Sequence, residues 1–148
     1  MMLSDAQREF IEKNHSAAMI VSRANGAAHA VRVGIAMVDG KLWSSGTQER
    51  LRTRLLRRDP RCTLLVFGTG PWFLTLETAV TILEGPDVPE LSVRLFQVMQ
   101  ADLQPPPPAG HIAWFGVPLT LDAFRQAMID ERRIIYEFEA QRVYGLIG

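Results

Sequence analysis

Apolar and polar residues alternate along much of the chain with the two-residue period that is typical of half-buried β-strands. The period is clearest in residues 72–83, where one predicted strand face carries Leu74, Leu76, Thr78, Val80 and Ile82. Helical spacing replaces this period in a few shorter segments. The pattern therefore predicts a mainly β protein with peripheral α-helices.

The first half of the chain also contains two tight-turn signals. Residues 17–23, 28–38 and 41–45 are apolar and strand-like, and they are separated by Asn25-Gly26 and Asp39-Gly40. Asn-Gly and Asp-Gly pairs supply the positive φ angles that two-residue hairpin turns require. We therefore predict three consecutive antiparallel strands joined by two hairpins.

Four helices and three further strands complete the predicted elements. Ser4 and Gln7 have the spacing of a capping box, so a helix is expected just after them. The predicted helices are residues 5–14, 47–58, a segment that opens at 87–90 and extends through Met99, and 121–133. The other predicted strands are residues 62–67, 134–138 and 142–146, and the prolines at 105–108 form a stiff linker.

These elements favour a small antiparallel barrel. About six strands alternate with the helices, and the early strands pair through tight turns. Within 148 residues, a closed or nearly closed barrel best hides the edges of such a sheet. The length fits one domain, residues 1–148.

Composition narrows the classes of partner. The net charge is +0 with a pI near 6.8, so no overall field attracts nucleic acid or anionic lipid. The N-terminus is charged where a signal peptide would be apolar, and no run approaches the roughly 20 apolar residues of a membrane span. We expect a cytoplasmic protein that binds neither nucleic acid nor membrane. A single cysteine, Cys62, and three histidines without ligand spacing predict no disulfide and no metal site.

The sharpest chemical signal is a strand end followed by a basic helix. Small and hydroxyl residues, Ser45, Gly46 and Thr47, precede a segment that carries Arg50, Arg52, Arg54, Arg57 and Arg58. Hydroxyl groups, free amides at a helix start and guanidinium groups together suit a phosphate. The alternative interpretation is a solvated basic face of a surface helix.

Other common catalytic motifs are missing from the sequence. It contains no Gly-x-Gly-x-x-Gly, no phosphate-binding Gly-x-x-x-x-Gly-Lys and no Gly-x-Ser-x-Gly. The aromatic residues Trp43, Trp72, Trp114 and Phe115 are interpreted as core or interface residues rather than a stacking platform. An enzyme without an evident acid–base pair fits redox chemistry carried by a bound cofactor.

Three segments carry a resemblance to a known family. They are His29-Ala30-Val31-Arg32-Val33, Leu55-Leu56-Arg57-Arg58-Asp59-Pro60-Arg61 after Ser45-Gly46, and Arg142-Val143-Tyr144-Gly145. With these segments the chain resembles the pyridoxamine 5′-phosphate oxidase-like superfamily of flavin-binding split barrels. It is most similar to the short branch that holds F420-dependent reductases.

The resemblance implies a six-stranded split β-barrel, FMN-binding-protein-like, that forms a homodimer with the cofactor between subunits. It implies F420 as the cofactor, with FMN as the alternative. The implied cofactor-binding residues are Val31, Arg32, Val33, Ser45, Gly46, Thr47, Arg50, Arg52 and Arg54. Arg32, Gly46 and Leu55 depart from the common proline, threonine and asparagine of the family.

The leading hypothesis is an oxidoreductase that transfers a hydride between bound F420 or FMN and a small unsaturated substrate. No catalytic side chain is assigned. A second hypothesis is a flavin or F420 carrier or sensor without turnover, because an acid–base pair is missing. A third is a barrel that binds protein or nucleic acid through its arginine helix, against which the neutral net charge weighs.

Overall fold

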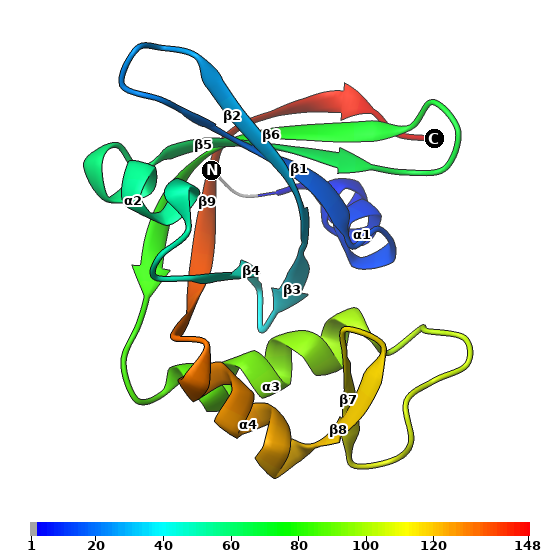
Figure 1. The fold of residues 1–148 in the computed structure, drawn as a ribbon. Coiled ribbons are helices and arrows are strands. Elements are labelled where there is room, and N and C mark those ends of the chain that lie inside the picture. The colour runs from blue at the N-terminus through cyan, green and yellow to red at the C-terminus, as the bar shows by residue number, and fades with distance from the viewer. Residues whose placement is uncertain (1–2) are drawn as a thin grey trace.

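The protein folds into a curled antiparallel sheet with four helices around it (Figure 1). The computed structural model describes residues 3–148. Seven strands form the sheet in the order β2-β1-β5-β6-β9-β4-β3. Their bounds are β1 Ser16–Ser22, β2 Ala28–Gly34, β3 Ala36–Val38, β4 Lys41–Thr47, β5 Arg61–Phe67, β6 Phe73–Leu83 and β9 Arg133–Leu146. The predicted barrel is confirmed, with one strand more than the six expected.

A bend at Ile35 closes the sheet. The segment predicted as one strand over residues 28–38 divides there into β2 and β3, which lie at opposite ends of the strand order. The hydroxyl of Ser44 in β4 donates to the carbonyl of Gly34 in β2 at 2.7 Å, across the closure. Because the two outer strands are consecutive in the chain, the sheet wraps on itself and little of its edge is left open.

The two predicted hairpin turns have different outcomes. Asp39 and Gly40 join the paired residues Val38 and Lys41 with φ angles of 50° and 78°, which confirms a two-residue turn. The prediction of a two-residue turn at Asn25-Gly26 is wrong. There the amide of Arg23 donates to the carbonyl of Ala27, which leaves a three-residue loop with Gly26 at φ 87°.

Three of the four helices are shorter than predicted, and the third along the chain has the predicted extent. The four are α1 Asp5–Lys13, α2 Leu51–Arg58, α3 Val88–Met99 and α4 Leu121–Asp130. The capping box of α1 is confirmed, since Ser4 and Gln7 exchange both hydrogen bonds. Thr47 belongs to β4, where it pairs with Arg133 of β9, so α2 begins four residues later than expected. At the end of α4, Arg132 has a φ of 53° and turns the chain into β9.

The predicted strands 134–138 and 142–146 are one strand, β9. Glu77 of β6 pairs with Arg142 and Thr78 with Ala140, so Gln141 is an extra residue, a β-bulge. The bulge explains why the alternation breaks there in the sequence although the strand continues.

A second unit packs below the barrel in Figure 1. It consists of α3, α4 and a two-stranded hairpin that sequence reasoning missed, β7 (His111–Trp114) and β8 (Val117–Thr120). Its own core contains Val93, Ile112, Phe124 and Met128. The hairpin was missed because its strands are four residues long and β8 contains Pro118.

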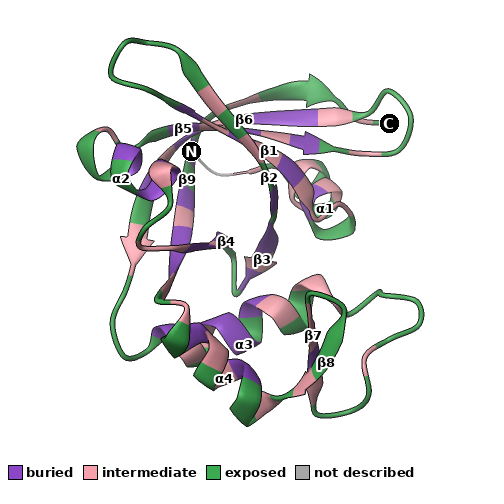
Figure 2. Ribbon diagram, viewed as in Figure 1, coloured by how far each residue is buried: buried purple, intermediate pink, exposed green. Residues whose placement is uncertain are grey.

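Buried residues concentrate inside the barrel and between α3, α4 and the strands (Figure 2). Met19, Leu64, Leu76 and Tyr136 are fully buried there. Cys62 is buried as predicted, and burial raises the pKa of its thiol to about 12. Within residues 3–148, no helix is both long and apolar enough to cross a membrane.

Candidate functional site

A cleft of about 390 Å³ lies between the barrel and the second unit. Strands β2 and β4 and the start of α2 contribute one side, while α3, the β7–β8 turn and the start of β9 contribute the other. The lining residues are Val31, Arg32, Val33, Gly34, Ser44, Ser45, Arg50, Arg52, Phe96, Met99, Trp114, Phe115 and Arg133.

Most of the residues implied by the resemblance meet in this cleft. Val31, Arg32, Val33, Ser45, Arg50 and Arg52 line it. The other three, Gly46, Thr47 and Arg54, are not among its lining residues. Because the first six come from β2, β4 and the start of α2, closure of the barrel is what brings them together.

Arg52 is the least expected side chain of the cleft, because a charged residue is rarely buried without a partner. It is 7% exposed, and its Nε has no hydrogen-bond partner among the described residues. Burial lowers the pKa of its guanidinium, and the charges of Arg50 and Arg133 lower it further, whereas Tyr136 raises it. Like charges that converge in this way create a place where an anion is stabilised.

Arg52 packs on a tyrosine, Tyr136, whose hydroxyl belongs to a buried series of hydrogen bonds. Thr53 Oγ1 donates its proton to the carbonyl of Thr47 at 2.7 Å, so the hydroxyl of Tyr136, 2.5 Å away, must donate to Thr53. The guanidinium of Arg52 lies over the Tyr136 ring, 5.6 Å from its centroid. These hydrogen bonds thus connect the end of β4 and the first turn of α2 to β9.

Gly46 serves this arrangement without lining the cleft. A Cβ at this position would lie 2.3 Å from the hydroxyl oxygen of Tyr136. The absence of a side chain is therefore required by the tyrosine beneath it. This contact gives a physical reason for glycine where the resembled family commonly has threonine.

The polar atoms of the cleft form a donor set suited to a phosphate. Ser45 Oγ is buried and, like Arg52 Nε, has no partner within residues 3–148. Arg50 is the N-cap residue of α2, and no side chain caps that helix end. Among the described residues, the lining of the cleft includes four arginines and no carboxylate, and one of the four, Arg133, is paired with Glu131 just outside the lining. A hydroxyl, a helix start and guanidinium groups fit an anionic group of a ligand.

The later arginines of α2 are placed differently. Arg54 and Arg58 are exposed on the surface. Arg57 forms a two-pronged ion pair with Glu84, with both N–O distances at 3.0 Å. The alternative of a solvated basic face thus describes this part of the helix, whereas Arg52 points into the cleft.

Sequence reasoning missed the wall formed by the second unit. Glu131 accepts hydrogen bonds from Arg133 at 2.7 and 3.0 Å and from the indole N–H of Trp114 at 3.0 Å. The Arg133 guanidinium lies over the Trp114 ring, 4.8 Å from its centroid. No short motif signals this cluster, because it combines a hairpin, the turn after α4 and the start of β9. Phe115 is 81% exposed, so it is not a core residue, and of its predicted core or interface role the interface part stays a prediction.

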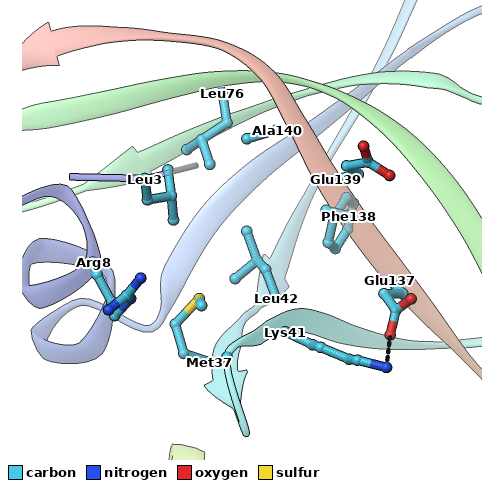
Figure 3. Close-up of a pocket in the computed structure, with 11 residues that line it drawn as sticks. Leu3, Arg8, Met37, Lys41, Leu42, Leu76, Glu137, Phe138, Glu139 and Ala140 are labelled. Atoms are coloured by element: carbon cyan, nitrogen blue, oxygen red, sulfur yellow. Dashed lines mark ion pairs between the residues drawn. The ribbon is translucent and has the colours of Figure 1, made fainter. Parts of the chain in front are cut away.

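A second hollow, of about 290 Å³, lies beside α1 and β9 (Figure 3). Its apolar floor includes Leu3, Met37 and Leu42. Its charges include both signs, and Lys41 is paired with Glu137 at 3.8 Å. This balance makes it a poorer anion site than the arginine cleft. Elsewhere in the described residues, no cluster of histidine, cysteine or acidic groups could hold a metal.

Several solved structures share this architecture. A conserved protein from Mycobacterium tuberculosis superposes with a TM-score of 0.71 at 18% identity, covering 98% of this chain and 85% of that one. An F420 reductase gives 0.69 at 14% identity, covering 96% and 98%. An FAD-binding protein from Mesorhizobium loti gives 0.62 at 15% identity, covering 97% and 94%. The fold is that of the split β-barrels.

The split barrel expected from the resemblance is thus confirmed as the fold. No family model matches the sequence. At such low identity the likeness concerns the backbone, and this chain's own side chains must carry any argument about function.

Proposed function

We propose that the protein is an oxidoreductase that transfers a hydride between a flavin-type cofactor and a small unsaturated substrate. The observation that carries the proposal is the pair of buried, unpartnered polar atoms, Arg52 Nε and Ser45 Oγ, in a cleft lined by four arginines. Both side chains line the cleft, so the phosphate of a bound cofactor would offer them a partner. Solved split barrels that include an F420 reductase and an FAD-binding protein support the choice of cofactor class.

The residues present fit distinct parts of such a ligand. Arg50, Arg52 and Ser45 would hold the phosphate, and the apolar side chains of Val31 and Val33 would border the ring system. When bound, the cofactor supplies the hydride chemistry. The chain's contribution is to orient the ring, to exclude water and to hold the anionic end in place.

Between the two cofactors, F420 is the leading proposal and FMN the alternative. F420 carries acidic groups beyond its phosphate, and exposed Arg54 and Arg58 extend the basic surface beyond the cleft. Arg57 contributes less, because Glu84 already neutralises it. This distribution supports the longer acidic ligand.

The proposal includes a homodimer in the cytoplasm. The outer face near the ends of β5, β6 and β9 exposes large apolar side chains that suit a subunit contact: Phe67, Trp72, Tyr144 and Leu146. Sedimentation analysis would test this directly, and a monomer at micromolar concentration would contradict it.

Titration of the protein with F420 and with FMN, followed by ligand fluorescence, tests the function. We expect micromolar or tighter binding of at least one, and reduction or oxidation of a quinone, enone or pyridoxal-type substrate by the loaded protein. Binding of neither cofactor would contradict the proposal.

The second candidate function is a cofactor carrier or sensor. Among the described residues the cleft lining contains no histidine, cysteine or carboxylate that could transfer a proton, which favours it. Tight binding with no turnover of any substrate in the panel would decide for the carrier. Detectable turnover would decide against it.

A further inference from the structure

Two hairpins of this protein have nearly the same turn but very different residues in it. Asp39-Gly40 has φ angles of 50° and 78°, and Phe115-Gly116 has 49° and 79°. Each pair connects two strands as a two-residue loop. Positive φ at both central positions favours Asn, Asp or Gly, so Asp39 suits its turn and Phe115 does not.

Phe115 is unfavourable in a second way. Its side chain is 81% exposed, the highest value among the large apolar residues of the described chain. Its ring meets Trp114 edge to face, with the centroids 4.8 Å apart. Neither the turn nor the core of the second unit therefore explains a phenylalanine at this position.

The position of Phe115 supplies a reason. It lines the arginine cleft, together with Trp114 and Phe96 on the same side and Val31 and Val33 on the barrel side. An aromatic ring held on a short, two-stranded arm at a ligand cleft is suited to contact a flat conjugated ring. A residue that its turn disfavours and that exposes an apolar side chain at a cleft is typical of a functional site.

We propose that Phe115 is a binding residue whose ring covers the tricyclic ring of the bound cofactor. This inference rests on the proposed function and adds the second wall to it. The phosphate end is held by the barrel and α2, and the ring lies against the hairpin of the second unit. F420 and FMN both carry a tricyclic ring, so the contact serves whichever of them binds.

The test uses the fact that the turn favours a residue such as asparagine at position 115, whereas the proposed cofactor contact needs an aromatic ring. Phe115→Asn installs a residue that the turn favours, so we expect the melting temperature to rise by about 3 °C. The same variant should bind F420 or FMN about three- to tenfold more weakly, the effect of losing one aromatic contact. Phe115→Ala should weaken binding equally without the gain in stability. Asp39→Asn changes the matching turn outside the cleft and should leave affinity unchanged.

The outcomes separate this inference from the proposed function. If the wild type binds neither cofactor, the proposed function fails. If the wild type binds and both Phe115 variants bind equally well, the inference alone is overturned. It is also overturned if Phe115→Asn changes the oligomeric state, because the side chain would then be a subunit contact. Opposite changes in stability and affinity would support it, since a merely structural residue moves both in the same direction.

Discussion

The two sides of the cleft are built on different principles. The barrel side carries the basic residues Arg50 and Arg52 beside Val31 and Val33, and Arg52 packs on Tyr136, which is hydrogen-bonded to Thr53. The side contributed by the second unit is aromatic, with Trp114 and Phe96 in edge contact at 5.1 Å. One side can fix an anion, and the other can receive a flat, apolar surface.

The difference teaches how the two ends of one ligand can be recognised by separate parts of a chain. The anion side depends on β-sheet register, because Thr47 must pair with Arg133 for α2 to begin beside the cleft. The aromatic side depends on a small local core around Phe124. Changes that damage one side should therefore spare the function of the other.

The largest expected effect on stability comes from removing a large side chain from the core of the second unit. Phe124 is fully buried and contacts both Phe96 and Trp114. Phe124→Ala should lower the free energy of unfolding by about 3–5 kcal/mol, from lost burial and the cavity left behind. Chemical denaturation measures it. Asp122→Ala, on the exposed surface of the same helix, is the control and should change stability by less than about 1 kcal/mol.

Gly46→Ala would disturb the barrel side instead. The new methyl group would meet the hydroxyl of Tyr136, which is fully buried and cannot move aside. We expect a loss of about 1–3 kcal/mol in unfolding free energy. Adding Tyr136→Phe should not restore the stability, because two ring carbons of the aromatic side chain would still lie 2.5 Å from the new methyl group. Equal stability of Gly46→Ala and the wild type would show that the tyrosine does not constrain this position.

Arg52→Ala should weaken FMN binding by about 1–3 kcal/mol, the range for a charge-assisted hydrogen bond. Riboflavin, which lacks the phosphate, should bind the variant and the wild type alike. Arg54→Ala removes an exposed arginine of the same helix and is the matched control. Parallel losses for FMN and riboflavin would mean that the phosphate does not lie at Arg52.

The smallest effect concerns the barrel interior and depends on pH. Burial raises the pKa of Cys62 from 9.0 to about 12. The unfolded chain therefore loses this proton first, and the stability that the buried thiol contributes is lost as the pH rises from 9 toward 12. At pH 10 the wild type should have lost about 1 kcal/mol through this group. The unfolding free energy of Cys62→Ala should not show this loss between pH 9 and pH 12. If it falls with pH as steeply as that of the wild type, the loss does not come from Cys62.

Much of the barrel could be predicted because its signals are local. Alternation located β6, and Asp39-Gly40 located a turn whose φ angles the structure confirms. The break at Ile35 could not be predicted from the local pattern, because it depends on β4 pairing with β9, a strand at the other end of the sequence. The three-residue loop at Gly26 shows the limit of a dipeptide signal, since loop length depends on which residues pair.

The candidate site was predicted in part for the same reason. Ser45, Arg50 and Arg52 follow one another near a strand end and a helix start, so their spacing carries information. Trp114, Glu131 and Arg133 come together only through tertiary packing. Phe115 has a local signal in retrospect: a large apolar residue before a glycine, between two short strand-like segments, in a turn position that disfavours it.

A crystal structure of the protein with bound F420 or FMN tests the central claim most directly. We predict that the phosphate lies within hydrogen-bonding distance of Arg52 and Ser45, with the ring between the barrel and Phe115. A cofactor seated in the hollow beside α1 and β9 (Figure 3), or with its phosphate away from Arg52, would contradict the account.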